Sequence, residues 1–362
     1  MIFWLVVAGL VVLWLWTRAQ LRRAELGRFD LPVVGHVVDR AAPSEAQTGV
    51  LARTRELASI GGSGKNRLER LRDWMDRAGD GQEQDAATEP VVAGGVPGEW
   101  VVAPGADPKR RILYLHGGGF MVGSARSHRL VTSTLSRLAG AAVLSLDYRL
   151  LPENARIDGI TDCRNAYRFI LGHGPDRTGP ADAVFVAGDS AGGNLTLMLA
   201  AWTRDEGLRP PDGAVALSPL ADSTMGSPTW QSNQATDPIL GPAAGLLRWI
   251  PRWLLFLGMW AQQRIHPCHP RVSPALGDLS GLPPILIQAS GAEMLLGDAR
   301  RYANKAQAAG SPVRLQTWPH MVHVWQLFGP DLDETREAYA EIAAFLDECV
   351  PRAIAAEART AG

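Results

Sequence analysis

The stretch Val184-Phe185-Val186-Ala187-Gly188-Asp189-Ser190-Ala191-Gly192-Gly193 decides the fold. Its first four residues form an apolar run typical of a buried strand, and a turn of small residues then leads into a helical stretch. A serine in the pattern Gly-x-Ser-x-Gly on such a tight turn is strained and needs small neighbours. The alternative for the bare pattern is an ordinary glycine-rich turn. The strand-to-helix setting favours a nucleophile, so we predict that the Ser190 hydroxyl stands clear of the sheet.

Short apolar runs alternate with helical stretches on both sides of this turn. Strands are predicted at 112–115, 141–146, 183–187, 214–217, 284–289 and 313–317, and helices at 127–139, 159–172, 191–204, 297–309 and 333–348. This alternation is typical of a mainly parallel sheet with helices on both faces. We therefore predict a single α/β domain over residues 99–350, the size that such sheets commonly reach.

Composition excludes several classes of protein. The chain has 362 residues, of which 46% are hydrophobic, and a formal net charge of −1. It has enough apolar material for a large core, and no basic surplus that would attract nucleic acid. Cys163, Cys268 and Cys349 are too far apart in sequence to suggest a zinc site or a disulfide framework. We expect neither a metal nor an organic cofactor.

A glycine run follows the strand predicted at 112–115. In His116-Gly117-Gly118-Gly119, glycines let the backbone approach a ligand and direct N–H groups at it. We predict an oxyanion hole made by the N–H groups of Gly117, Gly118 and Ala191, with His116 in a structural role. A phosphate-binding loop is the competing interpretation, but no Gly-Lys-Ser/Thr sequence follows.

A serine nucleophile needs a base and an orienting acid. When these follow the serine in the order acid, then histidine, the late candidates for the base are His320 and His323. The acid is predicted in the loop after the strand at 284–289, where Glu293 lies. Asp298 is the alternative acid, although it is better placed to cap the next helix.

Several motifs together resemble the bacterial hormone-sensitive-lipase-like esterases. They are His116-Gly-Gly-Gly, Asp147-Tyr148-Arg149-Leu150 with Pro152-Glu153, Gly188 to Gly193, and Leu282-Pro283-Pro284. The resemblance covers residues 99–348 and implies an α/β-hydrolase core under a helical cap, with ester hydrolysis through an acyl-serine. In the family a histidine precedes a hydrophobic and aromatic stretch, which selects His323. Two departures stand out: many members carry aspartate where Glu293 lies, and His320 replaces a frequent glycine.

The first sixteen residues are apolar enough to insert into a membrane. Met1 to Trp16 carry no charge, and as a helix they would be about 24 Å long, slightly short of a hydrocarbon core of about 30 Å. Positive charges follow at Arg18, Arg22 and Arg23. By the positive-inside rule we predict that residues 1–17 form an uncleaved anchor with the catalytic domain on the cytoplasmic side. The alternatives are a cleaved export signal and a helix on the domain surface. A membrane-anchored branch of the family is similar here.

The remaining segments are predicted as cap and linker. Residues 18–98 are interpreted as N-terminal cap helices, including one around 68–75, and an exposed linker at 79–98. A second cap insertion spans about 222–270, in which Pro251 interrupts an apolar stretch. This stretch is predicted to form part of an apolar lid, in which the side chains of Trp249, Trp253 and Phe256 contact the substrate. The alternative is that this stretch only packs into the cap core.

The sequence thus predicts a serine carboxylesterase or lipase that acts on small-molecule or lipid esters, with apolar ones favoured. The same machinery could hydrolyse lactones or amides. A non-catalytic small-molecule receptor on the same fold is a less favoured alternative, because every element of the catalytic machinery has a candidate residue. Besides the ester substrate and the membrane, a second copy of the chain, forming a homodimer, is considered as a partner.

Overall fold

A nine-stranded sheet runs through the body of the chain. The computed structural model describes residues 2–31, 35–40, 42–60, 66–77, 85–247, 249–329 and 332–352. Within them the strand order is β1-β9-β8-β7-β6-β4-β5-β3-β2, and every pair is parallel except those that β3 makes with β5 and β2. The strands are β1 (His36–Val37), β2 (Ala87–Ala93), β3 (Val96–Val102), β4 (Asp107–Leu115), β5 (Ala141–Leu146), β6 (Ala183–Asp189), β7 (Gly213–Leu217), β8 (Ile285–Ser290) and β9 (Val313–Trp318).

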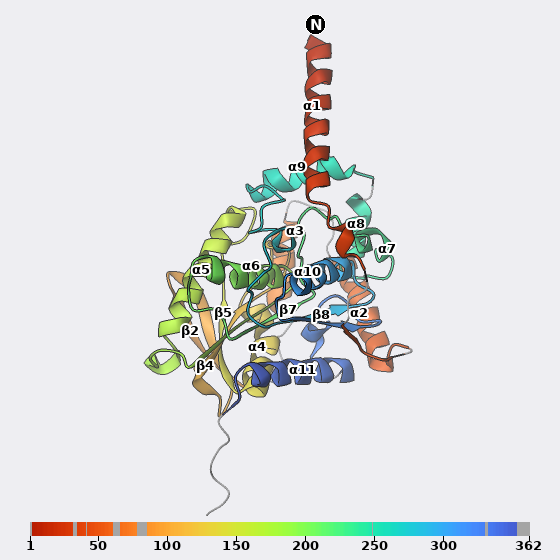
Figure 1. Cartoon of the computed structure of the whole chain (residues 1–362). Helices are drawn as coiled ribbons and strands as arrows, with labels where there is room; N and C mark the ends of the chain where they lie inside the picture. Colours follow the sequence, from red (N-terminus) through yellow and green to blue (C-terminus); the bar gives the residue numbers. More distant parts are fainter. Residues whose placement is uncertain are drawn as a thin grey trace, which may run out of the picture.

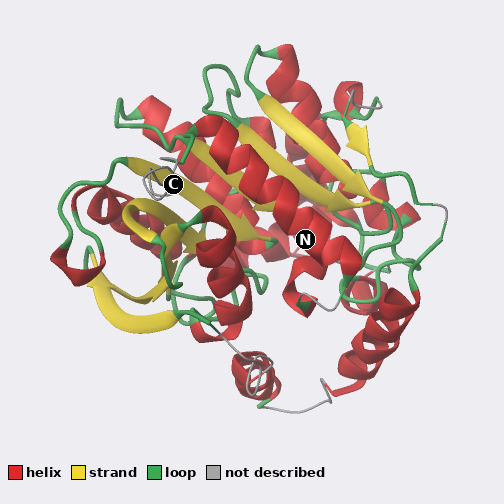
Figure 2. Ribbon diagram, turned by 90° about the horizontal axis from the view of Figure 1, so that it is seen from below, coloured by secondary structure: helices red, strands yellow, loops and turns green. Residues whose placement is uncertain are grey.

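Helices cover both faces of the sheet, as the alternation of elements predicts (Figure 1). One face packs against α5 (Arg156–Gly172), α6 (Ala191–Asp205) and α10 (Leu296–Ala308). The other face packs against α4 (Arg129–Ala139) and α11 (Asp333–Cys349). Figure 2, seen from below, shows helices crossing over the twisted strands. The predicted architecture of a mostly parallel sheet between two helical layers is confirmed.

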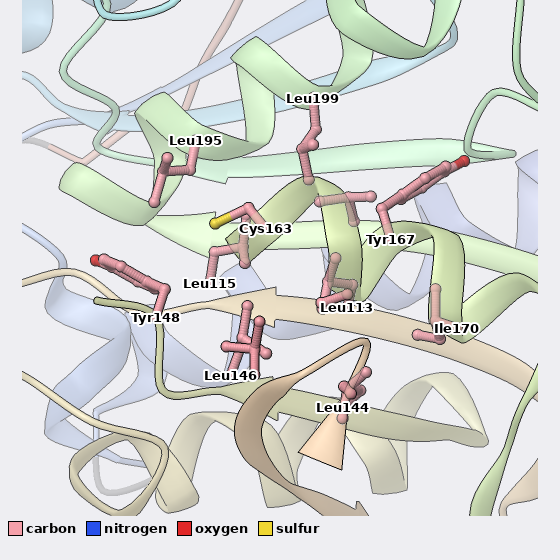
Figure 3. Packing of buried hydrophobic residues seen from close by; sticks show 14 of the residues in the cluster. Leu113, Leu115, Leu144, Leu146, Tyr148, Cys163, Tyr167, Ile170, Leu195 and Leu199 are labelled. Carbon is pink, nitrogen blue, oxygen red and sulfur yellow. The ribbon is translucent and has the colours of Figure 1, made fainter. Parts of the chain in front are cut away.

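The core follows the period-two alternation of a strand buried on both sides. Leu113 and Leu115 of β4 face the α5 and α6 layer, whereas Ile112 and Tyr114 face α4 and α11. All four side chains are fully buried. Figure 3 shows the part of the core between the sheet and the α5 and α6 layer, where Cys163 lies among leucines. Burial there raises the pKa of the Cys163 thiol, so this cysteine behaves as a small apolar residue.

The sheet begins earlier than the sequence predicts. Residues 79–98 are predicted to form an exposed linker, but β2 and the first three residues of β3 lie within 87–98, while 78–84 lie outside the described residues. Gly94 and Gly95, with φ of 62° and 89°, form the two-residue turn that joins the strands, and Ala93 pairs with Val96. A Gly-Gly pair between apolar runs is a hairpin signal, so the linker prediction was wrong for a recognisable reason.

The N-terminal segment also contributes a strand. Residues 18–98 are predicted as cap helices and linker, yet β1 pairs in parallel with β9, with His36 opposite Gln316. The chain before it is tied to α10, because Arg301 holds Asp30 through two hydrogen bonds of 2.5 and 2.9 Å. The short helix η1 (Gly27–Phe29) lies at this junction. Part of the segment therefore extends the sheet edge, which corrects the prediction.

Three longer helices lie in the N-terminal region, α1 (Ile2–Arg23), α2 (Glu45–Ile60) and α3 (Arg67–Arg77). Helix α1 projects away from the body (Figure 1) and is long and apolar enough to cross a membrane. Helix α3 is anchored by Arg72, which donates hydrogen bonds to the carbonyl oxygens of Met121 and Leu151 and to the Glu153 carboxylate. The periodicity at 68–75 thus marks a real helix.

The chain between β7 and β8 is helical. It contains α7 (Thr229–Ser232), α8 (Gly241–Leu247), α9 (Arg252–Gln263) and η4 (Pro274–Leu276). Pro251 stands immediately before α9, so the apolar stretch is broken into two helices where proline removes a backbone donor. Three further short turns of helix are η2 (Arg126–His128), η3 (Pro175–Arg177) and η5 (Trp325–Phe328).

Replacing Ile112 with alanine tests the importance of the central strand. Its side chain is fully buried on the face of β4 that packs against α4 and α11. Ile112→Ala should therefore lower the free energy of unfolding by about 2–5 kcal/mol. Urea unfolding in a nonionic detergent measures this. Val92→Ala on β2, where the side chain is 66% exposed, is the matched control and should change it little. Equal losses in the two variants would contradict the assignment of the core.

Candidate active site

Ser190 occupies the sharp turn between β6 and α6. Its backbone has φ 51° and ψ −110°, which is rare for a residue other than glycine. Its N–H donates to the Leu217 carbonyl oxygen at 2.7 Å, which fastens the turn to β7. A Cβ at Gly188 or Gly192 would lie 2.5 or 1.8 Å from the Leu115 carbonyl oxygen. The small residues of the pattern are therefore needed because the turn lies directly against β4.

His323 meets the serine hydroxyl from the loop after β9. Its Nε2 lies 2.9 Å from Ser190 Oγ, and its Nδ1 lies 2.6 Å from Glu293 Oε2. A carboxylate only accepts, so Nδ1 carries the proton and Nε2 is left to accept from the hydroxyl. Both His323 and Glu293 are buried, whereas Ser190 is partly exposed. The structure thus brings the three predicted residues together in one hydrogen-bonded line.

The electrostatic environment favours a proton on His323. Burial alone would lower the pKa of the imidazole, but the hydrogen bond to Glu293 and the negative charges of Glu293 and Asp237 outweigh burial. The net effect raises the pKa of His323 above its ordinary value. The arrangement therefore stabilises the protonated, imidazolium form of His323.

The loop that carries Glu293 is held from two sides. Glu293 Oε1 accepts the Ser290 N–H at 2.8 Å, and Asn233 Nδ2 donates to the Glu293 carbonyl oxygen at 2.9 Å. Asp237 Oδ2 accepts the Met294 N–H at 2.9 Å. Asn233 and Asp237 belong to the insertion between β7 and β8, and no sequence signal singled them out.

Asp298, the alternative acid, has other partners. Its Oδ2 accepts the N–H groups of Ala221 and Asp222 at 3.1 and 2.9 Å, and its side chain does not cap α10 as expected. Burial and the nearby charge of Asp222 raise the pKa of Asp298 to about 7. The carboxylate that contacts His323 is therefore Glu293, and the helix-cap prediction for Asp298 was wrong.

His320 lies apart from the histidine that contacts the serine. It is exposed, has φ 67°, and lines a hollow of about 550 Å³ together with Asp237 and Ala292. No hydrogen bond joins it to Ser190 in the described part of the chain. The choice of His323 over His320 thus agrees with the observed geometry.

The glycine loop differs from the prediction in one donor. The Gly117 N–H donates to Asp189 Oδ1 at 3.0 Å, so it is not available to an oxyanion, and its predicted role was wrong. Gly118 and Gly119 have φ of 105° and 62°, and, over the ranges that the structure describes, their N–H groups and that of Ala191 have no acceptor. Gly119, the third glycine of the run, is the donor that the sequence analysis passed over.

A buried polar cluster underneath holds this loop. Asp189, besides accepting from Gly117, accepts the Tyr114 hydroxyl at 2.7 Å. Burial would raise the pKa of Asp189, but the nearby His128 and the hydrogen bonds it receives lower it. His116 stacks on Tyr148 with ring centroids 4.3 Å apart, and the Tyr148 hydroxyl donates to the His116 carbonyl oxygen at 2.7 Å. Burial lowers the pKa of His116 to about 3, so this imidazole is neutral, as a structural role requires.

The three predicted lid residues do not share one environment. Phe256 is buried, with its ring edge-on to His266 at 5.3 Å between centroids. Trp253 is half-buried, and Trp249 is 79% exposed. The packing of Phe256 agrees with the alternative that part of the stretch lies in the cap core. Among the described residues, no group of three or more side chains could hold a metal ion.

Comparisons with known proteins agree with this geometry. A family model described as an alpha/beta hydrolase fold matches residues 112–327, more than half of the chain. The chain is 41% identical to an acetyl-hydrolase of Streptomyces hygroscopicus over 71% of its length and 81% of that protein. It is 33% identical to an esterase of Acinetobacter venetianus, over 73% and 83% of the two chains.

Solved structures give the same result. The crystal structure of an esterase from the bacterial hormone-sensitive lipase family superposes with a TM-score of 0.74 and 35% identity, and the match covers 85% of this chain and 99% of that one. A hormone-sensitive lipase from a metagenome library superposes with a TM-score of 0.73 and 32% identity, over 84% and 98% of the two chains. The chain therefore belongs to the bacterial hormone-sensitive-lipase-like esterases of the α/β-hydrolase fold.

Proposed function

We propose that this ester hydrolase cleaves carboxylic esters through an acyl intermediate on Ser190. The observation that carries the proposal is the continuous hydrogen-bonded line from Ser190 Oγ through His323 to Glu293, with distances of 2.9 and 2.6 Å. A hydroxyl is a weak nucleophile unless an adjacent base removes its proton, and this line supplies that base.

In the first half of the reaction, Ser190 Oγ attacks the ester carbonyl carbon while His323 Nε2 accepts the hydroxyl proton. The carbonyl oxygen becomes an oxyanion, which the N–H groups of Gly118, Gly119 and Ala191 stabilise. One such donor contributes about 3 kcal/mol to lowering the barrier. The C–O bond then breaks, and His323 gives its proton to the departing alcohol. Water repeats these steps on the acyl-serine and releases the carboxylic acid.

Glu293 acts by positioning and charge. It keeps the proton on His323 Nδ1 and stabilises the imidazolium, in keeping with the raised pKa of this histidine. The Ser290 N–H and the Asn233 amide fix the acid and its loop, so little reorganisation is needed when charge develops. These steps use only side chains and backbone N–H groups of the chain.

Apolar esters are the substrate class that the insertion favours. Residues 246–260 are predominantly apolar, and we propose that Trp249, Trp253 and Phe256 belong to the segment that shields an apolar acyl or alcohol group. A second candidate is an ester with a short acyl group, which the name of the acetyl-hydrolase of Streptomyces hygroscopicus supports. The two candidates differ in the acyl length of the best substrate.

Helix α1 supports a membrane-associated enzyme. Its apolar side chains are largely exposed, as in Trp4 at 70% and Val12 at 65%. In water such exposure would be costly, whereas a bilayer removes it. We therefore propose that α1 spans a membrane, with Arg18, Arg22 and Arg23 on the cytoplasmic side together with the catalytic domain.

An ester series tests the nucleophile and the acyl preference together. Wild type and Ser190→Ala are assayed in detergent with p-nitrophenyl esters from acetate to palmitate. The wild type should turn over the series with an optimum above acetate, and Ser190→Ala should lose about 10⁶-fold in kcat because the attacking hydroxyl is absent. Undiminished turnover in the variant would refute the nucleophile, and an optimum at acetate would favour the short-acyl candidate.

The pH profile tests Glu293 against Asp298. The base must be neutral to accept the proton, so the rate falls as pH drops through the raised pKa of His323. Glu293→Gln removes the charge that raises this pKa, so the acidic limb of kcat should move to lower pH, and kcat should fall by about 10⁴-fold.

Asp298→Asn is the matched control for this measurement. It neutralises a buried carboxylate that accepts the N–H groups of Ala221 and Asp222, and it should leave the acidic limb in place. If the limb moved in Asp298→Asn and stayed in Glu293→Gln, the assignment of the acid would be reversed.

A further inference from the structure

The foot of α1, meaning its C-terminal end from Trp16 to Arg23, packs against α9. Helix α9 in turn lies next to the glycine loop. Trp16 of α1 stacks on Trp260 of α9, with ring centroids 5.4 Å apart and planes at 24°. His266 stands edge-on to both rings, at 5.9 Å from Trp16 and 5.0 Å from Trp260. Figure 1 shows α9 lying across the foot of α1, at the end of the body from which α1 projects. The position of α1 thus determines where α9 lies relative to a membrane.

Large apolar side chains are exposed on α9 and on the turn that precedes it. They are Trp249 at 79%, Ile250 at 39%, Leu254 at 42% and Trp260 at 36%. Phe256, on the same helix, is turned inward and is 1% exposed. Apolar residues therefore lie on the outer side of α9 as well as on its inner side. Such a surface marks an interaction site.

The depth of α9 follows from the length of the apolar stretch of α1. This stretch, residues 2–16, is about 22 Å long, whereas a hydrocarbon core is about 30 Å thick. A span that is shorter than the hydrocarbon core is accommodated by local thinning of the bilayer, so the groups at its end lie close to the bilayer surface. Trp16 lies in the last apolar turn, so its partner Trp260 reaches the interface, where tryptophan is favoured. The outer side of α9 then lies at the depth of the headgroups.

The charge of this region matches an anionic leaflet. Between Asp237 and Asp278 the sequence contains no aspartate or glutamate, but it has four arginines, Arg248, Arg252, Arg264 and Arg271. Arg264 and Arg271 are exposed, whereas Arg252 donates hydrogen bonds to Thr224. The cytoplasmic leaflet is negative and attracts each nearby arginine by about 1 kcal/mol. Arg18, Arg22 and Arg23 at the foot of α1 add to the same surface. Residues 238–277 contain no carboxylate side chain, which an anionic leaflet would repel.

We propose that Trp249, Ile250, Leu254 and Trp260 form a bilayer-binding surface that seats the insertion on the membrane beside α1. This inference rests on the proposed membrane-spanning role of α1. The same helix reaches the glycine loop through Gln262, whose side-chain amide donates to Met121 Sδ at 3.5 Å. The Met121 N–H in turn donates to the Gly118 carbonyl oxygen. The helix that carries the surface therefore adjoins the glycine loop.

Spin-label accessibility tests where this surface lies without using activity. The full chain with Cys268→Ser and Cys349→Ser is reconstituted into vesicles of phosphatidylcholine and phosphatidylglycerol. A nitroxide is attached at Leu254→Cys, at Leu10→Cys in α1, or at Val92→Cys on β2, whose side chain is 66% exposed and serves as the aqueous control. Collision rates with oxygen, which concentrates in lipid, and with a water-soluble nickel chelate are compared.

We expect the oxygen-to-nickel collision ratio at Leu254→Cys to exceed that at Val92→Cys severalfold and to stay below that at Leu10→Cys, because the surface lies at the depth of the headgroups. A ratio equal to that at Val92→Cys, with Leu10→Cys in the hydrocarbon, would overturn the inference and leave the anchor intact. An aqueous ratio at Leu10→Cys would overturn the anchor and the inference together. Spin–spin broadening at Leu254→Cys that unlabelled protein relieves would identify a second copy of the chain as the occupant, which also overturns it.

Discussion

The site depends on the sharp turn that Ser190 makes between β6 and α6. A non-glycine residue at φ 51° costs about 1–3 kcal/mol, and this cost must be met by the surrounding contacts. The Ser190 N–H bonded to Leu217 fastens the turn to β7 on one side. On the other side Gly188 and Gly192 press against the Leu115 carbonyl oxygen of β4. The hydroxyl is thus positioned only because β6 lies between two other strands of the sheet.

The same turn determines which backbone donors face the reaction. Asp189 precedes the serine, and its carboxylate holds the Gly117 N–H and the Tyr114 hydroxyl. The residue beside the nucleophile is therefore bonded directly to the glycine loop. The lowered pKa of Asp189 keeps it ionised, so it continues to accept from both groups. The Gly117 N–H is used to hold the loop, whereas the N–H groups of Gly118 and Gly119 have no acceptor among the described residues.

What could be predicted from the sequence follows from how local each signal is. The central strands are apolar runs covered on both faces, and the nucleophile lies in a local pattern, so β4 to β9 and Ser190 were found. The direction of the Gly117 N–H depends on Asp189, 72 residues further on, and no local pattern reports it. Edge elements such as β1 are too short for periodicity. The β2–β3 hairpin did carry a local signal in Gly94-Gly95, but the polar residues before it, at 79–89, favoured a linker.

The insertion between β7 and β8 links the site to the N-terminal helix. At one end Asn233 and Asp237 hold the loop of Glu293, and the charge of Asp237 helps to raise the pKa of His323. At the other end Trp260 stacks on Trp16 of α1. Both contacts lie within one continuous segment of chain, from α7 to α9. The insertion therefore does more than cover the site, because the segment that holds the loop of Glu293 also packs against α1.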